Sequence, residues 1–169
     1  MNHPHQIPFR VLAVALTSRG LGYAILEGET SLVESSHTSV RNGNKNWQCL
    51  AKVKKLTAFY RPDALILQDV TAKDSRRSPR IKVLHREVMR FAAEHTLPVD
   101  LISEKELRSL LLGNAGGTKH EMAAMLMNHF PCELAFHLPP ARRSWQSEDS
   151  RMDTFDAAAL AMAFRIKGK

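Results

Sequence analysis

Two apolar runs separated by a short polar break dominate the start of the chain. Residues 11–26 read VLAVALTSRGLGYAIL, with the break at residues 17–20. A glycine-containing break between runs rich in Val, Ile and Tyr predicts a β-hairpin. The first run alternates little, which is typical of a strand that is buried on both faces. Residues 31–40 do alternate and predict a third, half-exposed strand antiparallel to the second.

Helical stripes and short apolar runs then follow one another. The expected elements are a helix over 47–60 capped by Asn44 or Asn46, a strand over 64–70, a helix over 83–95, a strand over 97–102, and helices over 103–112, 119–130 and 153–166. Residues 131–145 look irregular. This order predicts an α/β domain on a mixed five-stranded sheet, with three antiparallel N-terminal strands, then parallel strands, and helices on its flanks.

The length of the chain and its apolar content suit one domain. We expect residues 10–169 to form it and residues 1–9, which lack the apolar core of a signal peptide, to be a flexible arm. No apolar stretch approaches the ~18 residues of a membrane helix. Cys49 and Cys132 lack metal-ligand spacing. We interpret them as reduced thiols of a cytoplasmic protein.

Basic residues are in excess, with 24 Lys and Arg against 17 Asp and Glu, for a net charge of +7. Such an excess favours a polyanionic partner, nucleic acid before membrane, although a basic surface without any partner has the same composition. Residues 71–82 are predicted to be a mobile loop. The basic residues of this loop are Lys73, Arg76, Arg77, Arg80 and Lys82.

A second basic cluster, Arg142 and Arg143, stands beside Trp145 in the irregular segment. An aromatic ring between cations is typical of a platform on which nucleic-acid bases stack. The alternative is that Trp145 anchors the segment in the core or in a crevice.

Asp153 and Asp156 lie three positions apart at the start of the last predicted helix. At this spacing both side chains point to the same side of a helix. Paired carboxylates suit Mg²⁺ or Mn²⁺, since these hard ions prefer oxygen ligands. The alternative is structural: Asp153 caps the helix and Asp156 is a first-turn anion at the positive end of the helix dipole.

The chain resembles the RuvC-type Holliday junction resolvases, which belong to the RNase H-like superfamily. Residues 11–26 follow the family's first strand, I-L-G-I-D-P-G-S-R-x-T-G-Y-G-V-I, without a gap. Residues 62–70, PDALILQDV, match its fourth-strand pattern P-D-x-x-A-I-E-x-V. Lys119 matches a lysine at the start of the family's penultimate helix, and residues 153–161, DTFDAAALA, resemble its closing D-x-x-D-A-L-A helix.

This resemblance covers about residues 11–164. It implies an RNase H-like fold, an endonuclease that uses Mg²⁺ or Mn²⁺, a DNA partner and a homodimer. Two of the acids that it implies are replaced, however, because the first-strand Asp is Ala15 and the fourth-strand Glu is Gln68. Asp153 and Asp156 remain. In a two-metal nuclease the first-strand carboxylate bridges both ions, whereas alanine has no oxygen ligand and glutamine offers only a neutral carbonyl.

Other acids stand close in sequence to the replaced ones. Asp69 follows Gln68, but successive strand residues face opposite sides of a sheet, so we expect it to point away. Glu148 and Asp149 precede the last helix and are candidates to donate a replacement ligand. The family's aromatic residue after the fourth strand is Thr71 here, which weakens the case for the same mode of junction recognition.

We therefore expect a nucleic-acid-binding protein, with DNA favoured over RNA, whose nuclease activity is lost or weak. The alternatives are an active Mg²⁺-dependent endonuclease with a rearranged acidic site and an assembly protein that keeps only the fold. A tightly bound divalent ion is not expected. The expected site residues are Ala15, Gln68, Asp153, Asp156 and Lys119 at the catalytic positions, and Lys73, Arg76, Arg77, Arg80, Arg142 and Arg143 for nucleic acid.

Overall fold

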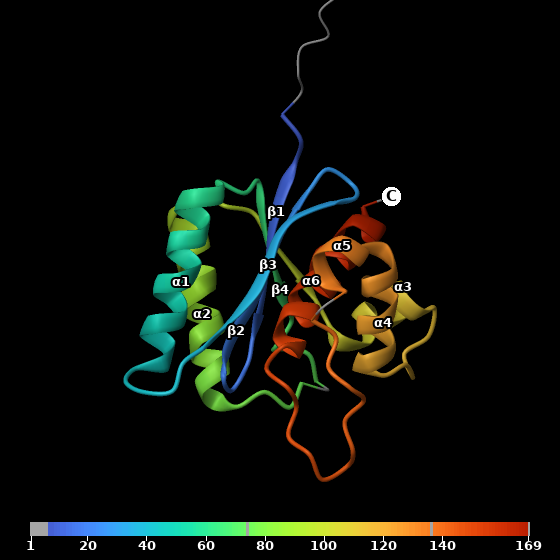
Figure 1. The fold of residues 1–169 in the computed structure, drawn as a ribbon. Helices are drawn as coiled ribbons and strands as arrows, with labels where there is room; N and C mark the ends of the chain where they lie inside the picture. Colours follow the sequence, from blue (N-terminus) through green and yellow to red (C-terminus); the bar gives the residue numbers. More distant parts are fainter. Residues whose placement is uncertain (1–6, 74, 136, 169) are drawn as a thin grey trace, which may run out of the picture.

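A computed structural model describes residues 7–73, 75–135 and 137–168 of the chain. Five strands form one sheet in the order β3-β2-β1-β4-β5 (Figure 1). The strands are β1 (Arg10–Leu16), β2 (Gly20–Glu27), β3 (Ser31–Ser39), β4 (Ala64–Gln68) and β5 (Val99–Ile102). The first three pair antiparallel, whereas β4 pairs parallel with β1 and β5 parallel with β4. The predicted mixed sheet is confirmed.

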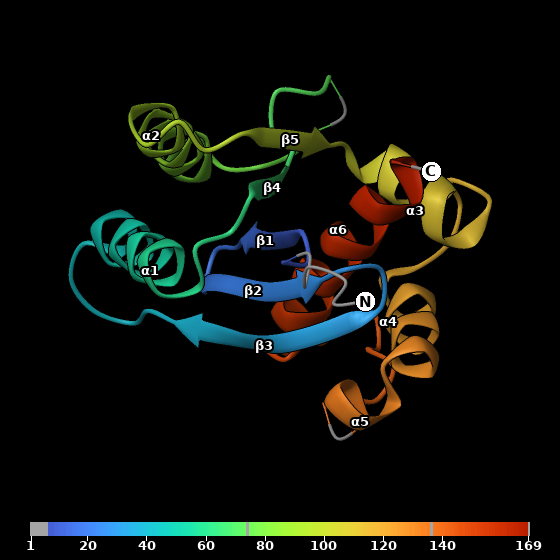
Figure 2. The same ribbon diagram turned by 90° about the horizontal axis from the view of Figure 1, so that it is seen from above.

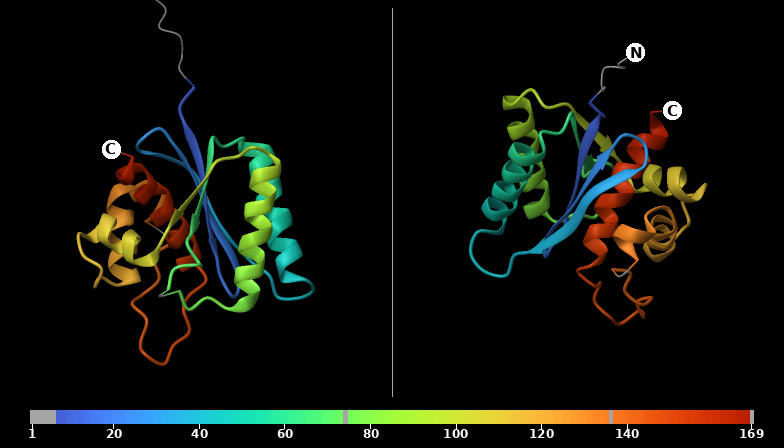
Figure 3. Two further views of the ribbon diagram at one scale, coloured as in Figure 1. Left: turned by 180° about the vertical axis from the view of Figure 1, so that it is seen from behind. Right: turned by 45° about the horizontal axis from the view of Figure 1, so that its top comes forward.

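Helices cover both faces of the sheet, as Figures 2 and 3 show. On one face lie α1 (Lys45–Tyr60) and α2 (Pro79–Glu94), and on the other lie α3 (Glu104–Leu112), α4 (Lys119–His129), α5 (Pro131–Leu134) and α6 (Met152–Lys167). Leu12 and Val14 of β1 belong to the core under α1 and α2, while Val11, Ala13 and Ala15 belong to the core under α6. Because both faces of β1 are covered, its sequence does not alternate.

Side-chain caps fix the starts of α1, α3 and α4, and another, described below, fixes the start of α2. Asn44, rather than Asn46, caps α1 by accepting a hydrogen bond of 3.0 Å from the Trp47 amide. Ser103 caps α3 in the same way. Thr118 and Glu121 form a reciprocal capping box at the start of α4, which places Lys119 in the first turn of that helix.

Two expectations about irregular segments are wrong. The predicted mobile loop over 71–82 ends earlier, since α2 already begins at Pro79 and so includes Arg80 and Lys82. The Ser78 side chain accepts a hydrogen bond from the Ile81 amide, and the fixed φ of Pro79 suits the first helical position. Residues 131–145 are not wholly irregular either, because α5 begins at Pro131.

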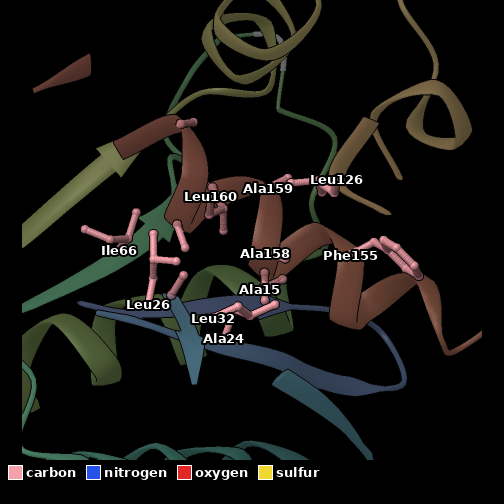
Figure 4. Packing of buried hydrophobic residues seen from close by; sticks show 14 of the residues in the cluster. Ala15, Ala24, Leu26, Leu32, Ile66, Leu126, Phe155, Ala158, Ala159 and Leu160 are labelled. Carbon is pink, nitrogen blue, oxygen red and sulfur yellow. The ribbon is translucent and has the colours of Figure 1, made fainter. Parts of the chain in front are cut away.

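Small residues let α6 approach the sheet closely. Ala157, Ala158 and Ala159 are almost fully buried, and Ala158 lies close to Ala15 of β1 (Figure 4). The contact is tightest at Gly22 of β2, where an added methyl group would lie 1.8 Å from the carbonyl oxygen of Asp153. This glycine therefore sets how near the start of α6 comes to the end of β1 and the start of β2.

The ends of the chain complete the fold. Most of the predicted arm over 1–9 lies outside the described residues, but Phe9 is described, and its ring stacks on Phe164 of α6 at 6.5 Å between centroids. Within the ranges that the structure describes, no helix is long and apolar enough to span a membrane.

Candidate functional site

Ala15 and Gln68 lie side by side at the carboxyl ends of two parallel strands. The β1–β4 register pairs Val14 with Leu67, so the next residues, Ala15 and Gln68, are neighbours. Ligands of open α/β sheets gather at such ends. The first turns of α6, which carry Asp153 and Asp156, cover this end of the sheet from one face (Figure 1).

Asp153 is held by the turn between β1 and β2. Its side chain is only 1% exposed. The Thr17 hydroxyl donates to Oδ2 at 3.0 Å, and Arg19 Nη2 donates to Oδ1 at 2.6 Å. Burial opposes the charge on Arg19, but the hydrogen bond to Asp153 and the negative charges of Asp153, Glu148 and Asp156 together outweigh it and raise the pKa of the guanidinium group. Both carboxylate oxygens of Asp153 are thus occupied by groups of the protein itself.

The structural alternative for Asp153 and Asp156 is wrong in its details. The residue at the N-cap of α6 is Arg151, so Asp153 lies inside the first turn and does not cap the helix. Asp156 lies beyond this turn. Its side chain reaches Lys119 instead of the free amides at the helix start.

Lys119 joins Asp156 to Glu148. Its Nζ atom lies 3.0 Å from an oxygen of each carboxylate. Burial raises the pKa of the Asp156 carboxyl, although Lys119 acts in the opposite direction. Burial also opposes the charge on Lys119, but the two carboxylates outweigh it and raise the pKa of the ammonium group. Glu148, one of the two loop acids considered as replacements, therefore does reach this centre.

Gln68 is held by Arg77, which comes from the segment before α2. The guanidinium group donates one hydrogen bond to Gln68 Oε1 and another, at 3.4 Å, to the carbonyl oxygen of Leu16 at the end of β1. Arg77 therefore ties the ends of β1 and β4 together and occupies the one oxygen that Gln68 could offer to a cation.

The remaining nearby acids have other partners. Asp69 accepts two hydrogen bonds from Thr71, through its amide and its hydroxyl, and these lower the pKa of its carboxyl. Asp149 forms a two-point ion pair with Arg151, which lowers the pKa of the Asp149 carboxyl to about 2. Neither side chain is directed to Gln68 by these contacts.

A pair of divalent ions does not fit the residues at this centre. Ala15 offers no oxygen, Gln68 is neutral and bound to Arg77, and both oxygens of Asp153 are engaged. In the part of the chain that the structure describes, no group of three or more His, Cys, Asp or Glu side chains is arranged to hold a metal ion. A two-metal site needs carboxylates that reach both ions.

Two adjoining hollows open beside this centre, with volumes of about 860 Å³ and about 680 Å³. They share Arg108 and Lys119 in their walls. We call them together the basic trough, and its basic residues are Arg76, Arg77, Lys105, Arg108, Lys119, His120 and Arg142. Segments far apart in sequence, before α2, in α3, in α4 and before α6, contribute to it.

The other predicted binding residues lie elsewhere. Arg80 has a structural role, since it bonds to Asn46 of α1 and to the carbonyl oxygen of Thr17 in the β1–β2 turn. The Arg143 guanidinium lies over the ring of Trp145. Lys73 is exposed and does not line either hollow.

No family model matches this sequence, and no curated protein matches it either. Solved structures do match. RuvC of Thermus thermophilus superposes with a TM-score of 0.68 at 18% identity, covering 95% of both chains. The same organism's RuvC in complex with a Holliday junction substrate gives a TM-score of 0.70 at 16% identity, covering 95% of this chain and 94% of that one.

A third match is the yeast mitochondrial Holliday junction resolvase Ydc2, with a TM-score of 0.65 at 13% identity over 96% of this chain and 80% of the other. The protein has the RuvC fold. This RNase H-like architecture is the one that the four sequence segments predict. At these identities the comparison establishes the fold, and the chemistry has to be argued from the residues of this chain.

Within the RuvC fold, several residues of this centre escaped the sequence analysis as candidates. Arg19 stands in the first matched segment but was not considered as the partner of Asp153. Lys105, Arg108 and His120 lie in helices, where charged residues usually mark a solvated face. No local pattern distinguishes a cation that faces a hollow from one that faces bulk water.

Replacing Lys119 by methionine is expected to destabilise the protein by about 1–3 kcal/mol at neutral pH, since it leaves the partly buried Asp156 beside Glu148 without a cation. The Asp156 pKa, already raised, rises further. When the pKa of a carboxyl is higher in the folded than in the unfolded state, the protein loses stability as the pH rises from the unfolded-state pKa to the folded-state pKa. The loss of stability caused by Lys119→Met should therefore become smaller at acidic pH. Urea unfolding from pH 4 to pH 8 measures this, with exposed Lys55→Met as control. An equal defect at every pH would contradict it.

Proposed function

We propose that this protein binds nucleic acid, DNA before RNA, through the basic trough, and that it cleaves its ligand weakly or not at all. The observation that carries the proposal is that two positions at the centre of the site hold residues without a negative charge. Positions that the resemblance assigns to acids hold Ala15 and Gln68, and Arg77 is bonded to Gln68. A centre of this composition attracts phosphate more readily than it holds two metal ions.

The charge of the trough supports this binding role. The acids in its walls are Glu104, Glu148 and Asp149, and each is already paired with a cation, Arg108, Lys119 and Arg151 respectively. Arg76, Lys105 and Arg142 are exposed in the same walls. The trough therefore has a surplus of positive charge, and neutralisation of several phosphates by such side chains supplies most non-specific affinity for DNA.

The matching structures support DNA as the ligand. The Thermus thermophilus RuvC complex contains a Holliday junction substrate, and a fowlpox virus resolvase complex contains substrate Holliday junction DNA. We propose the same class of ligand for this chain, and a homodimer as its functional form, on the strength of the shared fold and the basic trough.

Replacing Arg76 and Arg142 together by alanine is expected to weaken binding to all DNA sequences alike. Each lost phosphate contact lowers the slope of log K against log salt by about 0.9, so the double variant should lose about 2 units of slope. Fluorescence anisotropy between about 50 and about 200 mM salt measures both effects. Arg86→Ala with Arg90→Ala is the matched control, since both arginines are exposed on α2 across the sheet.

Two results would contradict the proposal. Affinity that does not change with salt would favour the assembly role, because phosphate neutralisation would not be involved. An equal loss in the α2 control would show that net charge, not the trough, determines binding.

An active endonuclease with a rearranged site remains the second candidate, and Glu148 favours it. Glu148 and Asp156 meet on the same Lys119 Nζ atom. Cleavage of branched and linear DNA by the parent protein in Mg²⁺ or Mn²⁺, abolished by Asp153→Asn or Asp156→Asn, would establish this candidate in place of the first. Unchanged DNA after prolonged incubation supports the binding role.

A further inference from the structure

Trp145 is an exposed aromatic side chain at the site end of the molecule. Its exposed fraction is 75%, so the interpretation as a core or crevice anchor is wrong. The segment between α5 and α6 that carries it projects beyond the end of the sheet where β1 ends (Figures 1 and 3). An indole ring left in water at such a place gains free energy from any partner that covers it.

A closed turn holds this ring in position. The Gln146 amide donates to the carbonyl oxygen of Arg143 at 3.0 Å, and the Arg143 amide donates to Gln146 Oε1 at 3.0 Å. Trp145 lies inside this four-residue turn. The Arg143 guanidinium lies 5.4 Å from the centroid of the indole ring, a distance at which a cation is attracted to the ring. The two hydrogen bonds of the turn and the contact with Arg143 therefore hold the indole ring in place.

The same loop forms part of the basic trough. Arg142 and Gln146, on either side of the turn's tip, line the larger hollow, and Lys119 lines it from α4. Trp145 lies between Arg142 and Gln146 in the chain, so a strand whose phosphates met the cations of this hollow would come close to the indole ring. Cations that bind phosphates next to an aromatic ring that stacks on a base form the usual arrangement for binding unpaired strands.

We infer that Trp145 is a specificity-determining residue of this chain, whose indole ring stacks on an unpaired base and so distinguishes ligands with a free base face from continuous duplex. The bases of a continuous duplex are stacked on one another and present no free face. Strand ends, branch points and single strands do present one. The inference rests on the proposed nucleic-acid binding and adds the residue that recognises an unpaired base.

The test compares one protein on three ligands of equal length: a single strand, a four-way junction and a duplex. Trp145→Ala is expected to weaken binding to the first two by about tenfold or more, the usual effect of removing one stacking ring, and to change duplex binding by less than about twofold. Trp145→Phe, which keeps a ring, should retain most of the preference.

Trp47 provides the matched control. It is 67% exposed, in the first turn of α1 on the opposite face of the sheet from the trough. Trp47→Ala should leave all three affinities unchanged. Since these are the only two tryptophans in the sequence, Trp47→Phe leaves Trp145 as the sole indole. A single strand should then quench its emission, whereas it should not quench Trp47 in Trp145→Phe.

The outcomes separate this inference from the proposed function. If the parent protein binds none of the three ligands, the proposed function itself fails. If the parent binds with strong salt dependence but Trp145→Ala weakens all three ligands equally, or none of them, the trough binds phosphates and the stacking role of Trp145 is overturned. A selective loss on the single strand and the junction supports both.

Discussion

Ala15→Asp combined with Gln68→Glu is expected to give the protein Mg²⁺-dependent cleavage of branched DNA well above any cleavage by the parent. The two changes place carboxylates at the ends of β1 and β4, which the first turns of α6 with Asp153 and Asp156 cover from one face. Two ions held there would activate a water molecule and stabilise the charge on the leaving oxygen. Because a partial site does not hold both ions, each single variant should cleave little or not at all.

The same variant should be less stable without metal. Ala15 is only 4% exposed, so an aspartate there adds a buried charge close to Asp153. We expect a loss of about 1–3 kcal/mol in the free energy of unfolding. Gln68→Glu alone should cost little, since the new carboxylate would pair with Arg77. Added Mg²⁺ should restore the stability of the double variant by binding only its folded state.

The matched control is Ala15→Asn in the Gln68→Glu background, which adds a side chain of nearly the same size as aspartate without its charge. It should remain inactive and should not respond to Mg²⁺ in urea unfolding. If this control cleaved as well as the double variant, the carboxylate at position 15 would not be the group that cleavage requires.

Gly22→Ala is expected to destabilise the protein by about 3 kcal/mol or more, the upper end of the effects of overpacking. The added methyl group would lie 1.8 Å from the Asp153 carbonyl oxygen and 3.0 Å from the Thr154 amide nitrogen. These are backbone atoms, so relief requires α6 to move away from β2. Such a movement also pulls Asp153 from Thr17 and Arg19, which hold its side chain.

Gly116→Ala is the control for this change. Its added methyl group would meet Asn114 Oδ1 at 3.5 Å, an ordinary contact. Urea midpoints of the two variants and the parent measure the difference. A Gly22→Ala midpoint equal to that of Gly116→Ala would contradict the close approach of α6 to β2.

The pattern of apolar residues along the chain is sufficient to predict the sheet. Strands buried on both faces, such as β1 and β4, are continuous apolar runs that are easily distinguished from amphipathic helices and from loops. The pattern failed at the start of α2, where the polar and basic residues around Ser78 and Pro79 hid a cap and a first helical position. The pattern also gives the wrong role for Asp153 as a helix cap. Both a cap and a buried ion pair use an aspartate near a helix start, and only the position of Arg19 distinguishes them.

The site was harder to predict than the fold, for a physical reason. The resemblance to the RuvC family is local in sequence, so the segments that contain Ala15 and Gln68 can be aligned with it along the chain. Which cation meets which acid depends on tertiary packing. The contacts of Arg77 with Gln68 and of Lys119 with Glu148 join segments whose side chains are long and could reach many partners.

The close packing of α6 on the first hairpin also determines when the site can exist during synthesis. The bonds that hold Asp153 join residues 134 and 136 positions apart in the chain. Contacts so distant in sequence form late, because a long loop must close before they are gained. Until residues 152–167 leave the ribosome, the face of β1 and β2 that contains Ala13, Ala15 and Ala24 has no cover. The apolar face of the sheet in the nascent chain is therefore exposed, and prone to aggregation, until α6 packs on it.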